Sequence, residues 1–155
     1  MLVDYNLLNE TSKFYVFPSS RKMYPEEFTA INQKVKQFLQ NLIAVNSFFE
    51  IKYQRFIIIF ISEETPLSID QNESLILLLN TFENEFKISL IDKVKVFFKQ
   101  GAYVQVKEIP DFKKLIKNKS VSKKTLIFNN FINTKSEYDC CWEVPADESW
   151  VSHLF

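Results

Sequence analysis

Glycine is almost absent from this sequence, in which Gly101 is the only one among 155 residues. The phosphate-binding loop of P-loop NTPases, G-x-x-x-x-G-K-S/T, and the dinucleotide-binding fingerprint, G-x-G-x-x-G, both need several glycines. These glycines let the backbone approach the phosphates closely enough for its N–H groups to bind them. The sequence therefore excludes ATP hydrolysis by a P-loop, and it contains no motif for a nucleotide cofactor.

Arginine is scarce as well, since Arg21 and Arg55 are the only two. Forked guanidinium contacts to phosphate or guanine are therefore few. The net charge is zero, so no overall field attracts nucleic acid or anionic lipid. The longest strongly apolar run, from Phe56 to Ile61, is too short to span a bilayer. The first residues lack the basic and apolar regions of a signal peptide. We expect a cytoplasmic protein with no membrane span.

Both cysteines, both tryptophans and the single histidine lie in the final segment, DCCWEVPADESWVSHLF. Cys140, Cys141 and His153 are too few ligands for a zinc site, and adjacent cysteines in an extended stretch point apart. We expect one cysteine to be buried and the other exposed. The C-x-x-C spacing of redox pairs is missing, although a vicinal disulfide stays open. His153 has no nucleophile pattern near it. The sequence indicates no catalytic, cofactor-binding or metal-binding residue.

Hydrophobic periodicity predicts alternating strands and helices. Strands are expected at 14–17, 48–54, 55–62, 93–99, 102–109 and 125–130. Helices are expected at 24–43, after the capping sequence that begins at Ser68, and from Pro110. Hairpin turns are expected around Gln54 and at Gln100-Gly101.

The resulting order, β-α-β-β-α-β-β-α-β, predicts an α+β fold. Its first six elements match the ferredoxin-like, split βαβ motif. We expect one compact domain over residues 1–155, with an antiparallel or mixed sheet and helices on one face. Residues 1–13 are expected to form a loose segment, and residues 135–155 a docked tail.

The tail is predicted to be a structural clasp that packs apolar side chains on the core. Pro145 is expected to end an extended stretch, after which a turn brings the second indole back inward. A chain that ends on apolar residues suits a docked terminus more than a frayed one. The predicted clasp residues are Trp142, Val144, Trp150, Leu154 and Phe155.

Charge is distributed unevenly along the chain. Residues 62–92 hold seven acids and one lysine, whereas residues 93–124 hold ten lysines and two acids. The basic stretch is a candidate docking surface for a weak polyanion contact, or else the solvated side of a short helix. An aromatic RNA-binding sheet is not expected, because the central strand RFIIIFIS is largely aliphatic and lacks glycine. The candidate docking lysines are Lys113, Lys114, Lys117, Lys119, Lys123 and Lys124.

Four segments, FEIKYQRFIIIFISEE, SIDQNESL, IFNNFINTKSEY and WEVPADESWVSHLF, together resemble a family of short Bacteroidota proteins often labelled "ABC transporter ATPase". The resemblance runs from about Phe14 to the last residue. It implies a single short domain and transfers no catalytic residue. The lone glycine argues that the label does not describe this chain's own chemistry. Pro66-Leu67 stand where relatives carry Gly-Cys, and His153 stands where they carry arginine.

The leading hypothesis is a cytosolic, non-enzymatic interaction protein whose partner is another protein. Two alternatives stay open. One is a small enzyme or redox protein that uses the Cys and His residues of the tail. The other is an RNA- or ribosome-associated protein that binds through the segment from Lys113 to Lys124. The sequence implies no cofactor and leaves the oligomeric state open.

Overall fold

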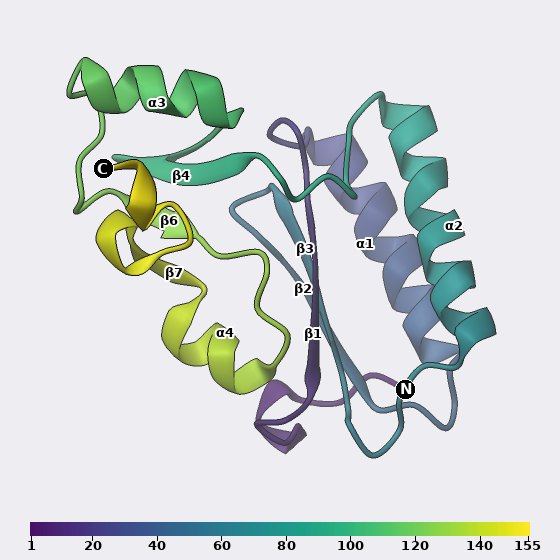
Figure 1. The fold of residues 1–155 in the computed structure, drawn as a ribbon. Coiled ribbons are helices and arrows are strands. Elements are labelled where there is room, and N and C mark those ends of the chain that lie inside the picture. Colours follow the sequence, from purple (N-terminus) through teal and green to yellow (C-terminus); the bar gives the residue numbers. More distant parts are fainter. The chain divides into compact units, whose positions relative to one another are not determined.

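The predicted order of strands and helices is confirmed in the computed structural model, which describes all of residues 1–155 (Figure 1). A further helix and a further strand follow the last predicted strand. The fold is α+β, with two antiparallel sheets. The chain forms two compact units: unit 1 comprises residues 1–91 and 133–136, and unit 2 comprises residues 92–132 and 137–155.

Unit 1 is built on a three-stranded sheet in the order β1 (Lys13–Pro18), β3 (Phe56–Ile61), β2 (Ser47–Lys52). Every residue of β3 is buried, as expected for an apolar strand covered on both faces. The antiparallel β3 lies between β1 and β2, which is the split βαβ arrangement. The hairpin predicted around Gln54 is confirmed, with Tyr53 and Gln54 at φ values of 57° and 54°.

Two long helices, α1 (Pro25–Gln40) and α2 (Ile69–Phe86), lie side by side on one face of this sheet (Figure 1). The predicted capping box begins α2: the Ser68 hydroxyl accepts a hydrogen bond from the Gln71 N–H at 3.1 Å, and the Gln71 side chain accepts one from the Ser68 N–H at 2.8 Å. The buried helix residues pack with alternate residues of β3. The main members of this core are Ile31, Val35, Leu39, Ile57, Ile59, Leu75, Leu79 and Phe82.

The N-terminal segment is anchored to unit 1, so the prediction that residues 1–13 are loose is wrong. Tyr5, in the 3-10 turn η1 (Tyr5–Leu7), places its ring 5.3 Å from that of Phe48 and 5.4 Å from that of Phe60. Leu8 is buried. The local sequence lacks a regular period, and the anchor comes from aromatic side chains of the distant strands.

Unit 2 contains a four-stranded sheet in the order β5 (Tyr103–Lys107), β4 (Val96–Gln100), β6 (Leu126–Phe128), β7 (Glu143–Pro145). The predicted hairpin between β4 and β5 is confirmed, and Gly101 adopts φ 62° in its turn.

The first three strands follow the ferredoxin-like order, but the fourth strand does not complete that sheet. A ferredoxin-like fold would place β4 beside β1, whereas β4 pairs with β5 and β6 in the second sheet. The tight turn to β5 gives β4 a partner close in sequence. The outer edge of β1 instead makes an isolated antiparallel bridge between Lys13 and Thr134.

The other two α-helices are short. The predicted helix α3 (Ile109–Lys117) buries Phe112, whose ring lies 5.2 Å from that of Phe98. Helix α4 (Lys135–Cys141) was not predicted, because it is short and most of its residues are weak helix formers, although Thr134 and Glu137 have the spacing of a capping box. The first N–H groups of α4 form hydrogen bonds with residues distant in sequence: the Lys135 N–H donates to the Ser12 carbonyl at 2.9 Å.

Candidate functional site

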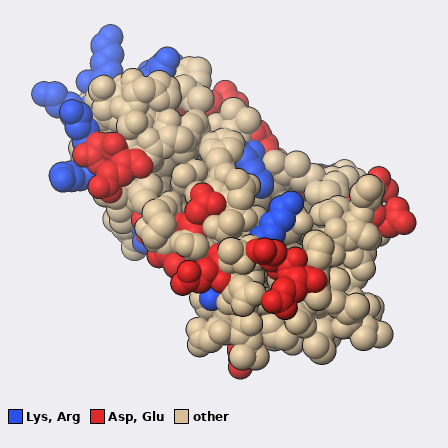
Figure 2. All heavy atoms as spheres, turned by 60° about the horizontal axis from the view of Figure 1, so that its bottom comes forward, with Lys and Arg blue, Asp and Glu red and all other residues tan.

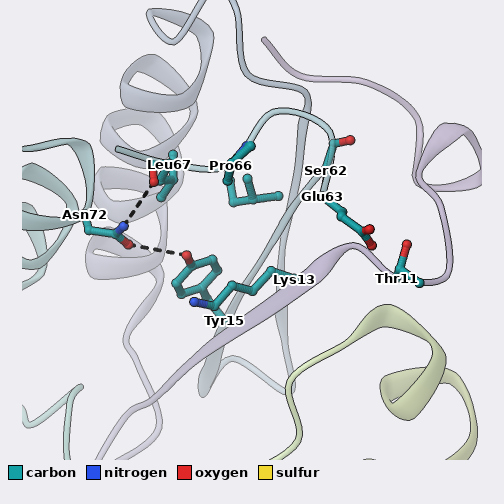
Figure 3. A pocket seen from close by; sticks show the side chains of 9 residues that line it. Thr11, Lys13, Tyr15, Ser62, Glu63, Pro66, Leu67 and Asn72 are labelled. Atoms are coloured by element: carbon teal, nitrogen blue, oxygen red, sulfur yellow. Dashed lines mark hydrogen bonds between the residues drawn. The ribbon is translucent and has the colours of Figure 1, made fainter. Parts of the chain in front are cut away.

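A cleft of about 250 Å³ opens in unit 1 where the first residues of β1, the end of β3 and the loop before α2 come together (Figure 3). The Tyr15 hydroxyl donates to the Asn72 Oδ1 at 3.3 Å, and the Asn72 Nδ2 donates to the Ser68 carbonyl at 3.1 Å. The Lys13 ammonium lies 5.0 Å from the centre of the Tyr15 ring. These contacts hold one wall of the cleft in place.

The opposite end of the cleft is formed by Thr11 and Glu63, which lie away from Asn72 in Figure 3. No histidine or cysteine lines the cleft. Its polar groups are an ammonium, a carboxylate, an amide and hydroxyls, among apolar surface from Pro66 and Leu67. This mixture suits binding of a polar group and an apolar side chain together.

The outer side of α2 carries an exposed apolar patch. Ile69 is 78% exposed and Leu77 64% exposed, and Ile76 is also exposed. Positions seven and eight residues apart lie on one side of a helix, as does Glu73 between them. We define the α2 docking face as Ile69, Glu73, Ile76 and Leu77.

The α2 docking face and the cleft are continuous. Asn72 lines the cleft and also lines a shallow hollow of about 380 Å³ formed with Glu73, Ile76 and Leu77. A ligand on the helix surface could therefore extend a side chain into the cleft.

This surface was not predicted from the sequence, although a signal for it exists. Residues 75–79 are five consecutive aliphatic residues, more than one helix face needs. Of these, Leu75 and Leu79 are buried in the core, whereas Ile76 and Leu77 remain outside it. An apolar run that exceeds the core-facing stripe of a helix indicates a second contact surface.

The α2 docking face is acidic at its edges. Asp70 and Glu73 are exposed on the helix, and Glu63 and Glu64 are exposed in the preceding loop. They belong to the segment 62–92, which carries seven acids and one lysine. The face therefore combines apolar side chains with negative charge.

The six candidate docking lysines all lie exposed on α3 or in the loop that follows it. Figure 2 shows basic side chains gathered on unit 2, on the side where Figure 1 draws α3. Only Lys114 makes an ion pair within the helix, with Asp111 at 3.7 Å. The lysines therefore form a solvated basic surface.

The predicted clasp residues lie against the interior of unit 2. Trp142 is 2% exposed, and its indole N–H donates to the Asn130 Oδ1 at 2.9 Å. Val144 pairs with Ile127 between β7 and β6. The remaining three, Trp150, Leu154 and Phe155, are half-buried and pack against the core of unit 2. Whether this packing holds the fold together stays a prediction.

The two cysteines are joined to each other by a disulfide bond at the end of α4. The prediction that their side chains point apart in an extended stretch is wrong, because the residues close a helix instead of continuing a strand. Cys140 is exposed and Cys141 is half-buried. His153 is exposed elsewhere in the tail and does not join them in a metal-binding group.

No protein-family model, curated protein or solved structure significantly matches this chain. The resemblance to short Bacteroidota proteins therefore stays a prediction. None of the helices has the length and apolar character needed to cross a membrane.

Proposed function

We propose that this protein is a cytosolic, non-enzymatic interaction protein that binds a segment of another protein on the α2 docking face. The observation that carries the proposal is the exposure of Ile69, Ile76 and Leu77 on one side of α2, beside the cleft. Single exposed apolar residues are common on protein surfaces, whereas a cluster next to a cleft is typical of a binding surface.

The shape of the surface favours an amphipathic helix as the bound segment. Apolar positions separated by seven and eight residues present a stripe about two helical turns long. A partner helix can place apolar side chains on this stripe at matching spacing, which is a common mode of peptide recognition. The cleft would accept one side chain or backbone carbonyl near Lys13 and Asn72.

Charge indicates the chemistry of the partner. Asp70 and Glu73 border the apolar patch, and Glu63 lies at the end of the cleft. Lys or Arg residues beside the apolar positions of the partner would meet these carboxylates. Such complementary charge mainly raises the association rate and selects the partner, while the apolar contacts provide most of the affinity. The proposed partner is therefore a protein with a basic amphipathic helix.

RNA binding through the lysines of α3 is the competing hypothesis. The six lysines are exposed, but the protein has zero net charge, and we expect only weak contact with bulk RNA at physiological salt.

Affinity capture from native lysate, with and without nuclease, tests the proposal when wild type is compared with surface variants. We expect a protein partner that survives nuclease treatment and is lost with Leu77→Lys and with Glu73→Lys. For a partner fragment measured by calorimetry, Leu77→Lys should weaken binding by about tenfold or more, which corresponds to about 1.4 kcal/mol. Circular dichroism checks that both variants keep their helices.

Tyr103→Lys is the matched control, because Tyr103 is 70% exposed on β5 in unit 2. It should bind like wild type. A partner that binds the α2 variants as well as wild type would contradict the proposal. Capture that disappears on nuclease treatment, and with Lys113→Glu combined with Lys117→Glu, would support the RNA hypothesis instead.

A further inference from the structure

The disulfide between Cys140 and Cys141 lies in a short, well-anchored junction of unit 2. Cys141 is the last residue of α4, and only Trp142 separates it from β7. The Trp142 carbonyl accepts a hydrogen bond from the Asn129 N–H at 2.6 Å. The Trp142 ring lies 5.2 Å from that of Tyr138 on α4. The backbone on the C-terminal side of the cysteines is therefore fixed by neighbouring elements.

This disulfide cannot act as a conventional structural crosslink. A disulfide stabilises a fold mainly by closing a loop in the unfolded chain, and the effect grows with the length of that loop. The two cysteines are consecutive, so no loop is closed. The bond joins two residues that a peptide bond already joins, so it connects no separate elements of the fold. Its remaining consequence is chemical, because it can be reduced and formed again.

The position of the bond makes it accessible to a reagent. Cys140 is exposed, Cys141 is half-buried, and the aromatic core begins only at Trp142. Disulfide exchange requires a thiolate to approach one sulfur along the S–S axis, so an exposed sulfur is the one attacked. The Sγ of Cys140 is that atom, and the Sγ of Cys141 is the leaving group.

We propose that Cys140 and Cys141 form a thiol–disulfide exchange site that accepts two electrons from a dithiol, either a small molecule or a pair of protein thiols. This site is independent of the α2 docking face, so the two proposals can fail separately.

The exchange takes place in two steps. One thiolate of the donor bonds to the Cys140 Sγ, the Cys140–Cys141 bond breaks, and the Cys141 thiolate takes a proton from water. The second donor thiolate then attacks the donor sulfur of the mixed disulfide and releases the Cys140 thiolate, which is also protonated. The donor leaves as its disulfide, and the protein holds two thiols. The Glu137 carbonyl, 3.6 Å from the Cys140 Sγ, is in place to accept the new S–H.

Reduction should be visible in the fluorescence of Trp142. Reduction opens the ring that the disulfide closes between Cys140 and Cys141, and Cys141 is the residue before Trp142. It also replaces a disulfide with two thiols beside the indole. The indole stays buried through its hydrogen bond to Asn130, so its emission should change in intensity more than in wavelength. Trp150 is the only other tryptophan, and Trp150→Phe leaves Trp142 as the sole indole reporter.

The test uses the full-length native protein and dithiothreitol as the dithiol probe. The protein is equilibrated across a series of reduced and oxidised dithiothreitol, quenched with acid and freed of dithiothreitol, after which a chromogenic reagent counts its free thiols and alkylation with mass spectrometry locates them. We expect the count to rise from zero to two per chain without denaturant, to fall again on reoxidation, and to change together with the fluorescence of the Trp150→Phe protein. Cys140→Ser and Cys141→Ser should each abolish the fluorescence change while the protein remains folded by circular dichroism.

Three results would overturn the proposal. The first is a count of two free thiols at every ratio of reduced to oxidised dithiothreitol, which means that the bond does not form in solution. The second is a disulfide that is reduced only after unfolding, which means that the site is closed to reagents. The third is oxidation that joins two chains, seen as a dimer on a non-reducing gel.

Discussion

Arg21 and Glu27 form a bidentate ion pair that ties the loop before α1 to the end of α2. The Arg21 Nη1 donates to the Glu27 Oε1 at 2.8 Å, and the Nη2 donates to the Oε2 at 2.7 Å. The Nη2 also donates to the carbonyl of Phe86, the last residue of α2, at 2.7 Å. The Arg21 hydrogen bond, assisted by the Tyr24 N–H, holds the pKa of the Glu27 carboxyl below its usual value, although burial opposes this.

This lowered pKa predicts how stability depends on pH. A carboxyl with a lower pKa in the folded state stabilises the fold above its unfolded pKa of about 4.3, and this contribution is lost as the pH falls through the folded pKa. Glu27→Gln should lower the free energy of unfolding by about 2 kcal/mol at pH 7, less than for a fully buried pair because Arg21 is partly exposed. The difference from wild type should shrink below about pH 4.

Urea unfolding at a series of pH values measures this effect. Glu26→Gln is the matched control, since Glu26 is the exposed neighbour in the same helix turn, and it should change stability by less than about 0.5 kcal/mol. The free energy of unfolding is plotted against pH for wild type and for Glu27→Gln. If the two curves stay parallel from pH 7 to pH 3, the ion pair is not the source of the pH dependence.

At the scale of elements, the sequence predicted those segments whose signals are local. The capping box at Ser68, the proline at the start of α1 and the glycine between β4 and β5 each specify a boundary through neighbouring residues. Helix α4 was missed although Thr134 and Glu137 have capping-box spacing, and its first N–H groups bond to carbonyls more than 100 residues earlier in the chain. Its formation depends on tertiary contacts that no window of sequence contains.

Ser68→Ala tests the local origin of α2. The substitution removes the hydroxyl that accepts the Gln71 N–H, and loss of such a cap should cost about 1 kcal/mol in the free energy of unfolding. Ser74→Ala is the control, because Ser74 is exposed within the same helix and alanine is the better helix former. In chemical denaturation, Ser68→Ala should therefore have a lower free energy of unfolding than wild type. Ser74→Ala should have a free energy of unfolding equal to that of wild type or higher. The reverse order would mean that tertiary packing alone fixes the start of α2.

At the scale of the whole molecule, the hydrophobic pattern of each strand does not determine which strands share a sheet. A ferredoxin-like sheet would place β4 beside β1, but the element order alone left the strand order open, and β4 has β5 and β6 as neighbours. The candidate site was missed for a similar reason. Periodicity shows that α2 has an apolar face, but only the packed structure shows which of its aliphatic side chains remain outside the core. The bond between the adjacent cysteines was left open by the sequence, because spacing alone does not show whether their sulfur atoms meet.

The segment from Lys135 to Phe155 contributes to the interior of both units. In unit 1, Lys135 is buried, and its ammonium donates to the Leu8 carbonyl at 3.1 Å and lies 4.3 Å from the centre of the Tyr5 ring. In unit 2, the segment provides the edge strand β7 and the buried side chain of Trp142. Each unit would lose interior contacts if this segment were absent.

Deleting residues 135–155 should therefore unfold or aggregate the protein. Trp142→Ala alone should cost about 3–5 kcal/mol, the range for removing a large aromatic side chain from a core, which approaches the net stability of many domains. His153→Ala, at an exposed position of the same tail, should stay within about 0.5 kcal/mol of wild type. Thermal unfolding followed by circular dichroism compares the three variants. If the truncated protein melts at the wild-type temperature, the tail is not a clasp, and its aromatic residues would then be better explained as a segment that binds a partner.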